Sequence, residues 1–283
     1  MNKYGYKKFE ELCNKNQPVW MGILNVTTDS FSDGGKYNSK ELALKRALEL
    51  VAHGAHIIDI GGVSTKPYSE KISSAFEFER LHETILFIKN KIPSDILISV
   101  DSFSPYVTSS LANENLIDII NDQFSARIEE NTLITDELEY VNNAQIAAKY
   151  NLGYILMHMQ GKPKNMQLNP YYISCEEEVI SFLKERLEFS ENLGVKFIAL
   201  DPGIGFGKSV ENNLKLISQD FIKKLSSLNK PILMGLSRKW FLGQLYPELV
   251  EPDTRDKVSK NYEFNCISYG VKIIRTHTMP SEL

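Results

Sequence analysis

The chain has 283 residues, 42% of them hydrophobic, and a formal net charge of −4 at pH 7. That length suits one large α/β barrel or two ordinary domains, and the hydrophobic content is enough for a sizeable core. The acidic balance argues against general nucleic-acid binding, although a locally basic site can still take a small anionic substrate. The three cysteines are far apart and have no metal-ligand spacing, which favours free thiols and a cytoplasmic location. No stretch resembles a signal peptide or approaches the roughly 20 apolar residues of a membrane span, so we expect no membrane partner.

Short apolar runs bounded by polar or turn-forming residues predict eight strands in chain order. They cover about residues 19–25, 56–60, 96–100, 117–120, 154–158, 197–200, 231–236 and 271–275. Helical spacing predicts helices over about 40–53, 73–91, 141–150, 175–193, 209–228 and 254–269, and one that starts near Pro105. In the first helix Ser39 is the expected N-cap, and the apolar face is marked by Leu44, Ala47, Leu48 and Val51.

Strands that alternate with helices pair in parallel through right-handed crossovers, and eight such units most often close into a TIM barrel. We therefore predict a single domain over residues 1–283, of the α/β class, built as a (β/α)8 barrel. Residues 1–18 form a polar lead-in that can be helical, and residues 122–140 are a long polar excursion on the rim. Only eight residues follow Arg275, so the eighth helix is expected to be short or missing, and residues 3–15 are candidates to cover the surface that it leaves.

Nearly every predicted strand ends near a polar side chain. These side chains are Asn25, Asp59, Asp101, Asn121, His158, Asp201, Ser237, Lys239, Arg275 and His277. A lone Asp at a strand end is more often a helix cap or a turn former, but capping does not explain the whole series. Because barrel active sites lie at the carboxyl ends of the strands, we expect these groups to converge on one rim.

Four of these side chains suit a flat, fused heterocycle with ring N–H, amino and carbonyl edges. Asp101, Asn121, Asp201 and Lys239 would offer alternating donors and acceptors around a flat space. An acyclic substrate needs fewer such groups, so the set favours a heterocyclic substrate.

The same rim has groups for an anion and for a cation. Arg275 and His277 are cationic or can become so, at a place where barrels commonly bind phosphate. Asn25, with Asp29 or Asp33, can hold a hard and partly hydrated cation such as Mg²⁺ beside a phosphate. Together with the heterocycle contacts, these groups indicate a heterocycle that bears a phosphate or a diphosphate.

Other conspicuous features are expected to be structural. The GIGFGKS stretch resembles a phosphate-binding loop, but Pro202 stands where that motif needs its first glycine. His53 and His56 flank a helix–strand junction on the side away from the proposed site. His158, at the end of a strand, is either a wall of the site or a buried polar group with satisfied hydrogen bonds.

Six motifs, in order, resemble the signatures of the dihydropteroate synthase family. They are ILNVTTDSFSDGG, DIGGVSTKP, LMHMQGKPKNMQ, LDPGIGFGK, GLSRKWFLG and IIRTH, and the resemblance runs from about residue 20 to 277. The family condenses 6-hydroxymethyl-7,8-dihydropterin diphosphate with 4-aminobenzoate, giving 7,8-dihydropteroate and diphosphate in folate biosynthesis. The resemblance therefore implies a transferase and sulfonamide target that acts by SN1-like loss of diphosphate, with Mg²⁺ as its cofactor, and it allows a homodimer.

The resemblance also implies roles for residues of this chain. The implied catalytic residues are Asp101, Asp201, Lys239, Arg275 and His277. The implied contacts are Asp101, Asn121, Asp201 and Lys239 for the pterin, Asn25, Thr65, Arg275 and His277 for the diphosphate, Phe31, Thr65, Lys66, Phe206 and Ser237 for the aminobenzoate, and Asn25 and Asp33 for Mg²⁺. No general base is implied, because the weakly basic aniline nitrogen of the aminobenzoate needs little deprotonation before it attacks.

The second loop departs from the family pattern. Val63 replaces a usual Glu, Lys66 replaces an Arg and so keeps the charge without the bidentate fork, and Tyr68 replaces a Gly. Two alternatives to the synthase are a pterin-binding barrel without turnover and a pterin-dependent methyltransferase barrel, and the Ser-Arg-Lys and Arg-x-His motifs argue against the second. If Arg275 serves only the diphosphate, Arg275→Ala abolishes turnover and leaves the binding of a pterin without diphosphate nearly unchanged.

Overall fold

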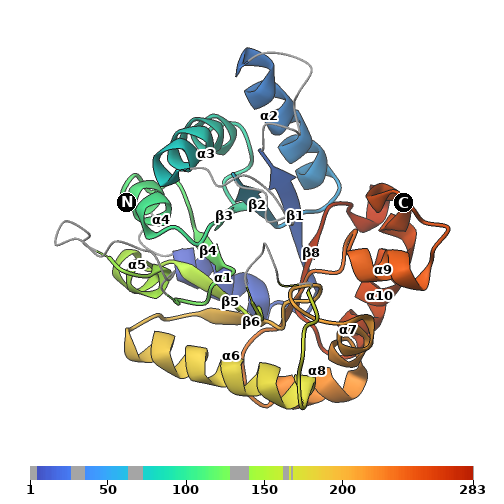
Figure 1. Cartoon of the computed structure of the whole chain (residues 1–283). Helices are drawn as coiled ribbons and strands as arrows, with labels where there is room; N and C mark the ends of the chain where they lie inside the picture. The colour runs from blue at the N-terminus through green and yellow to red at the C-terminus, as the bar shows by residue number, and fades with distance from the viewer. Residues whose placement is uncertain are drawn as a thin grey trace.

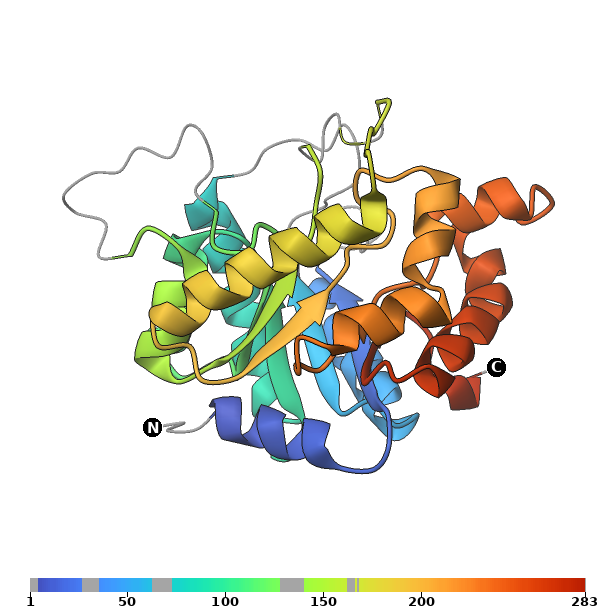
Figure 2. The same ribbon diagram turned by 90° about the horizontal axis from the view of Figure 1, so that it is seen from below.

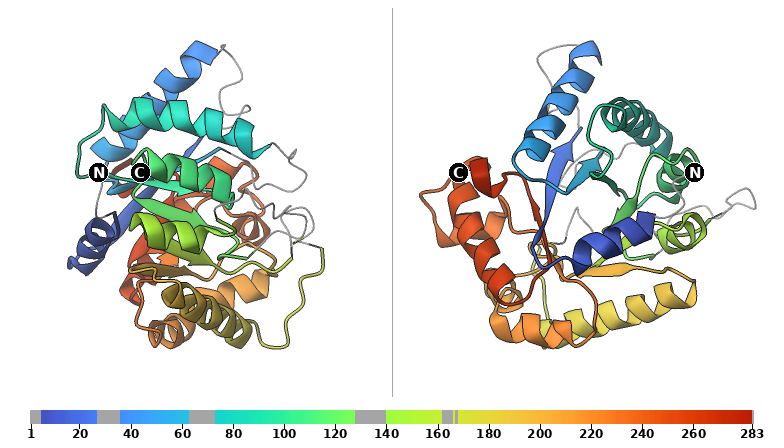
Figure 3. Two further views of the ribbon diagram at one scale, coloured as in Figure 1. Left: turned by 90° about the vertical axis from the view of Figure 1, so that its left-hand side faces the viewer. Right: turned by 180° about the vertical axis from the view of Figure 1, so that it is seen from behind.

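Eight parallel strands form one sheet in the order β6-β5-β4-β3-β2-β1-β8-β7. An isolated parallel bridge between Leu200 and Ile232 joins the two edges, and the Leu200 N–H donates to the Pro231 carbonyl at 2.9 Å. The sheet therefore closes into a barrel with helices around it, as Figures 1 and 3 show. This computed structural model describes residues 5–26, 36–62, 73–127, 140–161, 166 and 168–282. The predicted TIM barrel is confirmed.

The strands are short and lie close to their predicted positions. They are β1 (Val19–Asn25), β2 (Ile57–Gly61), β3 (Leu97–Asp101), β4 (Ile119–Asp122), β5 (Gly153–Met157), β6 (Ile198–Asp201), β7 (Leu233–Met234) and β8 (Ile273–Thr276). The predicted range 231–236 is too long for β7. Pro231 has no N–H to donate to a ladder, and after Met234 the chain turns so that the Lys239 N–H donates to the Leu236 carbonyl.

Helices surround the barrel on its outer side (Figure 1). They are α2 (Lys36–Ala52), α3 (Ser74–Lys89), α4 (Pro105–Asn113), α5 (Asn143–Tyr150), α6 (Cys175–Asn192), α7 (Val210–Leu216), α8 (Gln219–Ser226), α9 (Trp240–Leu245) and α10 (Asp256–Ser268), with a 3₁₀ turn η2 (Pro252–Arg255) before the last. The single helix predicted over 209–228 is wrong, because the Ser218 side chain accepts the Phe221 N–H and so begins a second helix. The short helix α9 is not predicted from the sequence. None of the described helices has both the length and the apolar composition needed to cross a bilayer.

Helix α2 differs from its prediction in its start and in its buried face. It begins before Ser39, which is therefore not its N-cap. Ala43 and Leu50 are fully buried, whereas Leu48, predicted on the apolar face, is 41% exposed. Packing against β1 sets this orientation, since a Cβ on Gly22 would lie 3.0 Å from the Leu50 side chain.

Helix α1 (Gly5–Asn14) lies across the amino-terminal end of the barrel, as Figure 2 shows. Its Phe9 is fully buried and meets the Phe197 ring edge to face, with 5.1 Å between ring centres. A Cβ on Gly153 would lie 2.5 Å from the Phe9 ring, so glycine at that position lets the helix approach β5. The helix contacts β3, β4 and β5, and it closes the floor of the barrel rather than the side beside β8 for which residues 3–15 are candidates.

Beyond β8 the described residues contain one short 3₁₀ helix, η3 (Pro280–Glu282). It packs against α2, where Arg46 Nη1 donates to Glu282 Oε1 at 2.8 Å and His53 Nδ1 lies 3.0 Å from the Ser281 hydroxyl. The short final helix is thus confirmed for the described part of the chain. His53 has the structural role predicted for it, and so does His56, whose Nδ1 accepts a backbone N–H of β1 at 3.1 Å.

Alternation along the strands sorts their side chains into two layers. Residues such as Ile58 and Ile98 face the helices and belong to the larger core, whereas Ile57 and Leu97 face inward and pack over α1. Nearer the carboxyl ends the inward positions become polar, and the parallel register sets these strand ends level with one another. Of the predicted excursion over 122–140, residues 128–139 lie outside the described residues.

Candidate active site

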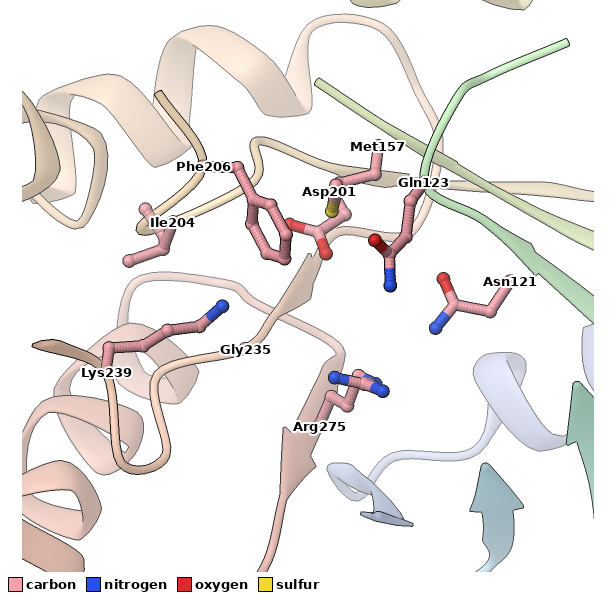
Figure 4. A pocket seen from close by; sticks show the side chains of 9 residues that line it. All are labelled: Asn121, Gln123, Met157, Asp201, Ile204, Phe206, Gly235, Lys239 and Arg275. Atoms are coloured by element: carbon pink, nitrogen blue, oxygen red, sulfur yellow. The ribbon is translucent and has the colours of Figure 1, made fainter. Parts of the chain in front are cut away.

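A pocket lies at the carboxyl ends of the strands (Figure 4). Its lining residues are Asn121, Gln123, Met157, Asp201, Ile204, Phe206, Gly235, Lys239 and Arg275. Among them are three predicted pterin contacts, one diphosphate contact and one aminobenzoate contact. The structure therefore brings groups of all three kinds to a single cavity.

Two carboxylates on the inner face hold Arg275 of β8. Its Nε donates to Asp59 Oδ2 at 2.6 Å, and its Nη2 donates to Asp101 Oδ2 at 2.7 Å. Asn121 Nδ2 also donates to Asp59 Oδ2, at 3.0 Å. Burial raises the pKa of Asp101 to about 6 although Arg275 opposes the shift, whereas Asp59 and Asp101 raise the pKa of Arg275 against the effect of its burial. Asp59 thus positions two predicted site residues, a role that its place at a strand end did not reveal.

The position of Arg275 alters one prediction. Its side chain lies inside the pocket that Asn121 and Asp201 line, as Figure 4 shows, and not only at the rim. Removal of the guanidinium would leave the buried carboxylate of Asp59 and the half-buried one of Asp101 without their cation. The expectation that Arg275→Ala spares pterin binding does not follow from this geometry.

Asp201 and Lys239 contribute an acceptor and a cation to the same cavity. Asp201 Oδ1 accepts the Gly203 N–H at 2.7 Å, and Lys239 Nζ lies 4.2 Å from the centre of the Phe206 ring. Burial raises the pKa of Asp201. Burial lowers the pKa of Lys239 to about 8, and Asp201 opposes this shift. An acceptor, a cation and an aromatic face suit a flat polar ring.

The loop after β6 is fastened to the end of β5 by a fully buried lysine. Lys208 Nζ lies 2.9 Å from His158 Nδ1 and donates to the carbonyls of Gly203 and Phe206, both at 2.9 Å. Burial is the main cause that lowers the pKa of His158, so the imidazole is neutral and its Nδ1 accepts the ammonium hydrogen. A Cβ on Gly203, whose φ is +69°, would lie 1.8 Å from the His158 carbonyl oxygen. His158 is therefore the satisfied buried group of the two alternatives left open.

Ser237 and His277 form a second pair on the rim. The Ser237 Oγ accepts the His277 backbone N–H at 3.2 Å and lies 3.0 Å from His277 Nδ1. Arg238 anchors this loop to α10, because its guanidinium donates to both carboxylate oxygens of Asp256, at 3.0 and 2.8 Å. Burial, with Arg238 and Arg275 nearby, lowers the pKa of His277 to about 3. His277 is therefore expected to be neutral in this geometry, and of the predicted pair Arg275 supplies the positive charge.

Gln123 is a pocket residue that the sequence did not point out. Its side chain is buried, its Nε2 donates to Asp101 Oδ1 at 2.7 Å, and its Oε1 has no hydrogen-bond partner among the described residues. Asp122 fixes the turn that holds it, since the Asp122 carboxylate accepts two N–H groups of that turn. Its place two residues after Asn121, on the turn that continues β4, is the signal that could have identified Gln123.

Several predicted site residues lie outside the described residues. They are Phe31, Asp33, Thr65 and Lys66, and the loop positions Val63 and Tyr68 lie outside them too. Asn25 ends β1 with an exposed side chain. A Cβ on Gly61 would lie 3.6 Å from the Asn25 Oδ1 and 3.6 Å from the Asp101 Cβ, so Asn25 lies beside the inner carboxylates. Among the described residues no cluster of three or more His, Cys, Asp or Glu side chains is arranged to hold a metal. The predicted magnesium and aminobenzoate contacts therefore stay predictions.

Comparison with known proteins decides the family. A sequence profile described as pterin binding enzyme matches residues 21–277. The dihydropteroate synthase of Haemophilus influenzae is 37% identical over 262 residues, which cover 92% of this chain and 88% of that protein. The chain belongs to the dihydropteroate synthase family. The predicted family and transferase class are thus confirmed.

Solved dihydropteroate synthases share the fold. The Yersinia pestis enzyme, determined with a sulfonamide drug complex, has a TM-score of 0.81 and 35% identity, with 94% of this chain and 90% of that chain covered. The Xanthomonas albilineans enzyme, determined with 4-aminobenzoic acid, has a TM-score of 0.81 and 30% identity, with the same coverage of 94% and 90%. The barrel fold is therefore that of a dihydropteroate synthase.

Proposed function

We propose that this chain condenses 6-hydroxymethyl-7,8-dihydropterin diphosphate with 4-aminobenzoate, giving 7,8-dihydropteroate and diphosphate in folate biosynthesis. The observation that carries the proposal is the pocket in which Asn121, Asp201, Lys239 and Arg275 meet. Its donors and acceptors suit the edges of a pterin, and its cations suit a departing diphosphate. Membership of the dihydropteroate synthase family supports the same reaction.

The pocket favours an SN1-like departure of diphosphate. As the carbon–oxygen bond breaks, its electron pair leaves with the diphosphate and the pterin methylene becomes cationic. The carboxylates of the half-buried Asp101 and the buried Asp201 have fixed negative charge close to the ring, which stabilises that cation more than the ground state. Lys239 and Asn121 donate to ring acceptors and hold the pterin in place.

Two further groups act on the diphosphate. Arg275 donates to it while it stays tied to the inner carboxylates. His277 is neutral, and with the Ser237 hydroxyl donating to Nδ1 its Nε2 keeps the hydrogen and donates to a phosphate oxygen. Both donors gain strength as negative charge grows on the leaving group.

The proposal includes Mg²⁺, held by Asn25 and Asp33. The carboxamide oxygen of Asn25 is an exposed hard donor on the rim, which fits an ion that keeps several waters and takes further oxygens from a diphosphate. When bound there, Mg²⁺ would neutralise part of the charge on the leaving group.

The aminobenzoate is proposed to bind beside the pterin methylene. Phe206 lines the pocket and Ser237 lies on the neighbouring rim, and Phe31, Thr65 and Lys66 would complete the site. The aniline nitrogen then attacks the cationic carbon and releases its proton. Sulfonamides, one of which is named in the complex of the Yersinia pestis relative, are proposed to occupy the same place.

The direct test is to mix the protein with the dihydropterin diphosphate and Mg²⁺, and to follow diphosphate release with and without 4-aminobenzoate. Release together with dihydropteroate is the expected result. Release without coupling would mean that 4-aminobenzoate is not the second substrate. Pterin binding without release would overturn the proposed activity and leave a pterin-binding barrel without turnover.

The remaining parts of the proposal concern location and assembly. We infer a cytoplasmic enzyme that acts on small molecules alone, a view that the buried free thiols of Cys13, Cys175 and Cys266 support. A homodimer is also proposed, and sedimentation of the purified protein would distinguish it from a monomer.

A further inference from the structure

Gln123 is a buried polar side chain of the pocket that the proposed reaction does not use. It stands on the turn after β4 and is 5% exposed. Figure 4 shows its carboxamide directed into the cavity between Asp201 and Asn121. A polar group in this position needs a hydrogen-bonding explanation.

The orientation of the amide is fixed by its neighbour. Gln123 Nε2 donates to Asp101 Oδ1 at 2.7 Å, and the other oxygen of Asp101 accepts from Arg275 at 2.7 Å. A flipped amide would set Oε1 against a carboxylate oxygen, and two acceptors would then repel each other. The Oε1 atom is therefore held as an acceptor.

That acceptor is itself unpaired. Gln123 Oε1 is buried and has no hydrogen-bond partner among the described residues, and the same is true of Asp59 Oδ1. A buried acceptor without a donor is unfavourable, so a ligand that supplies an N–H at this place binds more tightly than one that does not.

The shape of the pterin indicates which N–H this is. Its C6 substituent, with the diphosphate, must face the rim, so the pyrimidine edge lies deepest. Ring atoms N1 and N8 are neighbours, since both are bonded to the same ring-fusion carbon. Asn121, on the strand, stands deeper than Gln123, on the turn that follows. A donor from Asn121 suits N1, which is an acceptor, and Gln123, one turn position nearer the rim, then lies beside N8.

We propose that Gln123 makes the pocket selective for the reduced pterin, with Oε1 accepting the N8–H of the 7,8-dihydropterin while Nε2 holds Asp101. This inference rests on the proposed function. In a fully oxidised pterin N8 has no hydrogen and is itself an acceptor, so it meets the fixed Oε1 with lone pair against lone pair. The enzyme thereby selects the ring whose methylene cation forms in the proposed reaction.

The test compares two ligands that differ in this hydrogen. Dissociation constants of 6-hydroxymethyl-7,8-dihydropterin and 6-hydroxymethylpterin, both without diphosphate, are measured anaerobically by calorimetry on the wild type, on Gln123→Met and on Met157→Leu. The wild type should prefer the dihydropterin by roughly tenfold, as one hydrogen bond allows. Gln123→Met should bring the ratio close to one, whereas Met157→Leu, which reshapes an apolar wall, should change both constants alike.

Other outcomes would overturn either this inference or the proposed function. Equal affinities in the wild type, a result that needs no variant, would overturn the inference. An unchanged ratio in a folded Gln123→Met would also overturn it, and so would equal losses for both ligands, because these indicate a merely structural role. If the wild type binds neither pterin, the proposed function fails. If it binds both and only the selectivity is absent, the proposed function stands without this inference.

Discussion

Burial raises the pKa of Asp101, Arg275 between the Asp101 and Asp59 carboxylates opposes that shift, and Asp59 adds to it. The arrangement needs a cation that donates from two nitrogens at once, which an ammonium cannot do in the same geometry. Arg275→Lys should therefore lower kcat/KM for the pterin diphosphate by roughly 10²–10³ and also weaken the binding of a pterin without diphosphate. Steady-state kinetics and calorimetry would measure both effects. Arg186→Lys on α6 is the matched control. If Arg275→Lys leaves the binding of a pterin without diphosphate unchanged, Arg275 serves only the diphosphate.

Two titrating groups set the pH range in which the pocket has its full set of charges. Burial raises the pKa of Asp101 to about 6 and lowers the pKa of Lys239 to about 8. As the pH falls through about 6, Asp101 gains a proton and loses its charge, and as the pH rises through about 8, Lys239 loses its proton. The profile of kcat/KM for the pterin diphosphate should therefore be bell-shaped between these values. In Lys239→Arg the alkaline limb of the profile should shift to higher pH. If it stays in place, another group causes that limb.

The strand-end residues were predictable because a barrel forces them together. Asp101, Asn121 and Asp201 each follow an apolar run, and parallel pairing sets those ends level. Gln123 was not predicted as a site residue because it stands on a turn beyond the predicted strand. The role of Lys208 depends on two backbone carbonyls, and no sequence pattern records where a carbonyl points.

The loop between β6 and α7 is the element on which one wall of the pocket depends. Lys208 is its buried anchor, with two carbonyls and an imidazole around one nitrogen. Lys208→Met would leave these acceptors without a donor, and we expect it to lower the free energy of unfolding by about 2–5 kcal/mol. Urea denaturation would measure the change. Lys215→Met on the adjacent helix α7, where the side chain is 49% exposed, should change it by less than about 0.5 kcal/mol. A stable Lys208→Met variant would show that other groups position this loop.

Element boundaries were less predictable than element order. The sequence around Ser218 has continuous helical spacing, yet its hydroxyl accepts an N–H of the next turn and starts a new helix. In α2 the buried side follows from the space above Gly22, which only the assembled β1–α2 pair defines. Local spacing therefore predicts that an element exists, whereas contacts with distant residues decide where it begins and which face it buries.

For the whole molecule, the alternation of eight strands with helices was enough to predict the barrel. The place of α1 was not predictable, because an amphipathic helix can cover any apolar surface of suitable size. Its contacts with β3, β4 and β5 close the floor of the barrel, at the end opposite the pocket. The fold thus separates a floor that stabilises from a rim that binds.

That separation can be tested at Phe9. The Phe9 ring is fully buried between α1, Phe197 and β5, so Phe9→Ala leaves a cavity and should lower the free energy of unfolding by about 3–5 kcal/mol. Because the ring lies at the far end of the barrel from Arg275, KM for both substrates should stay within about twofold of the wild type at a temperature where the variant is folded. Phe76→Ala on α3, where the side chain is 48% exposed, is the control and should cost less than about 1 kcal/mol. A large rise in KM in Phe9→Ala would mean that the floor and the rim are coupled, and that the inner face transmits packing changes along the strands to the pocket.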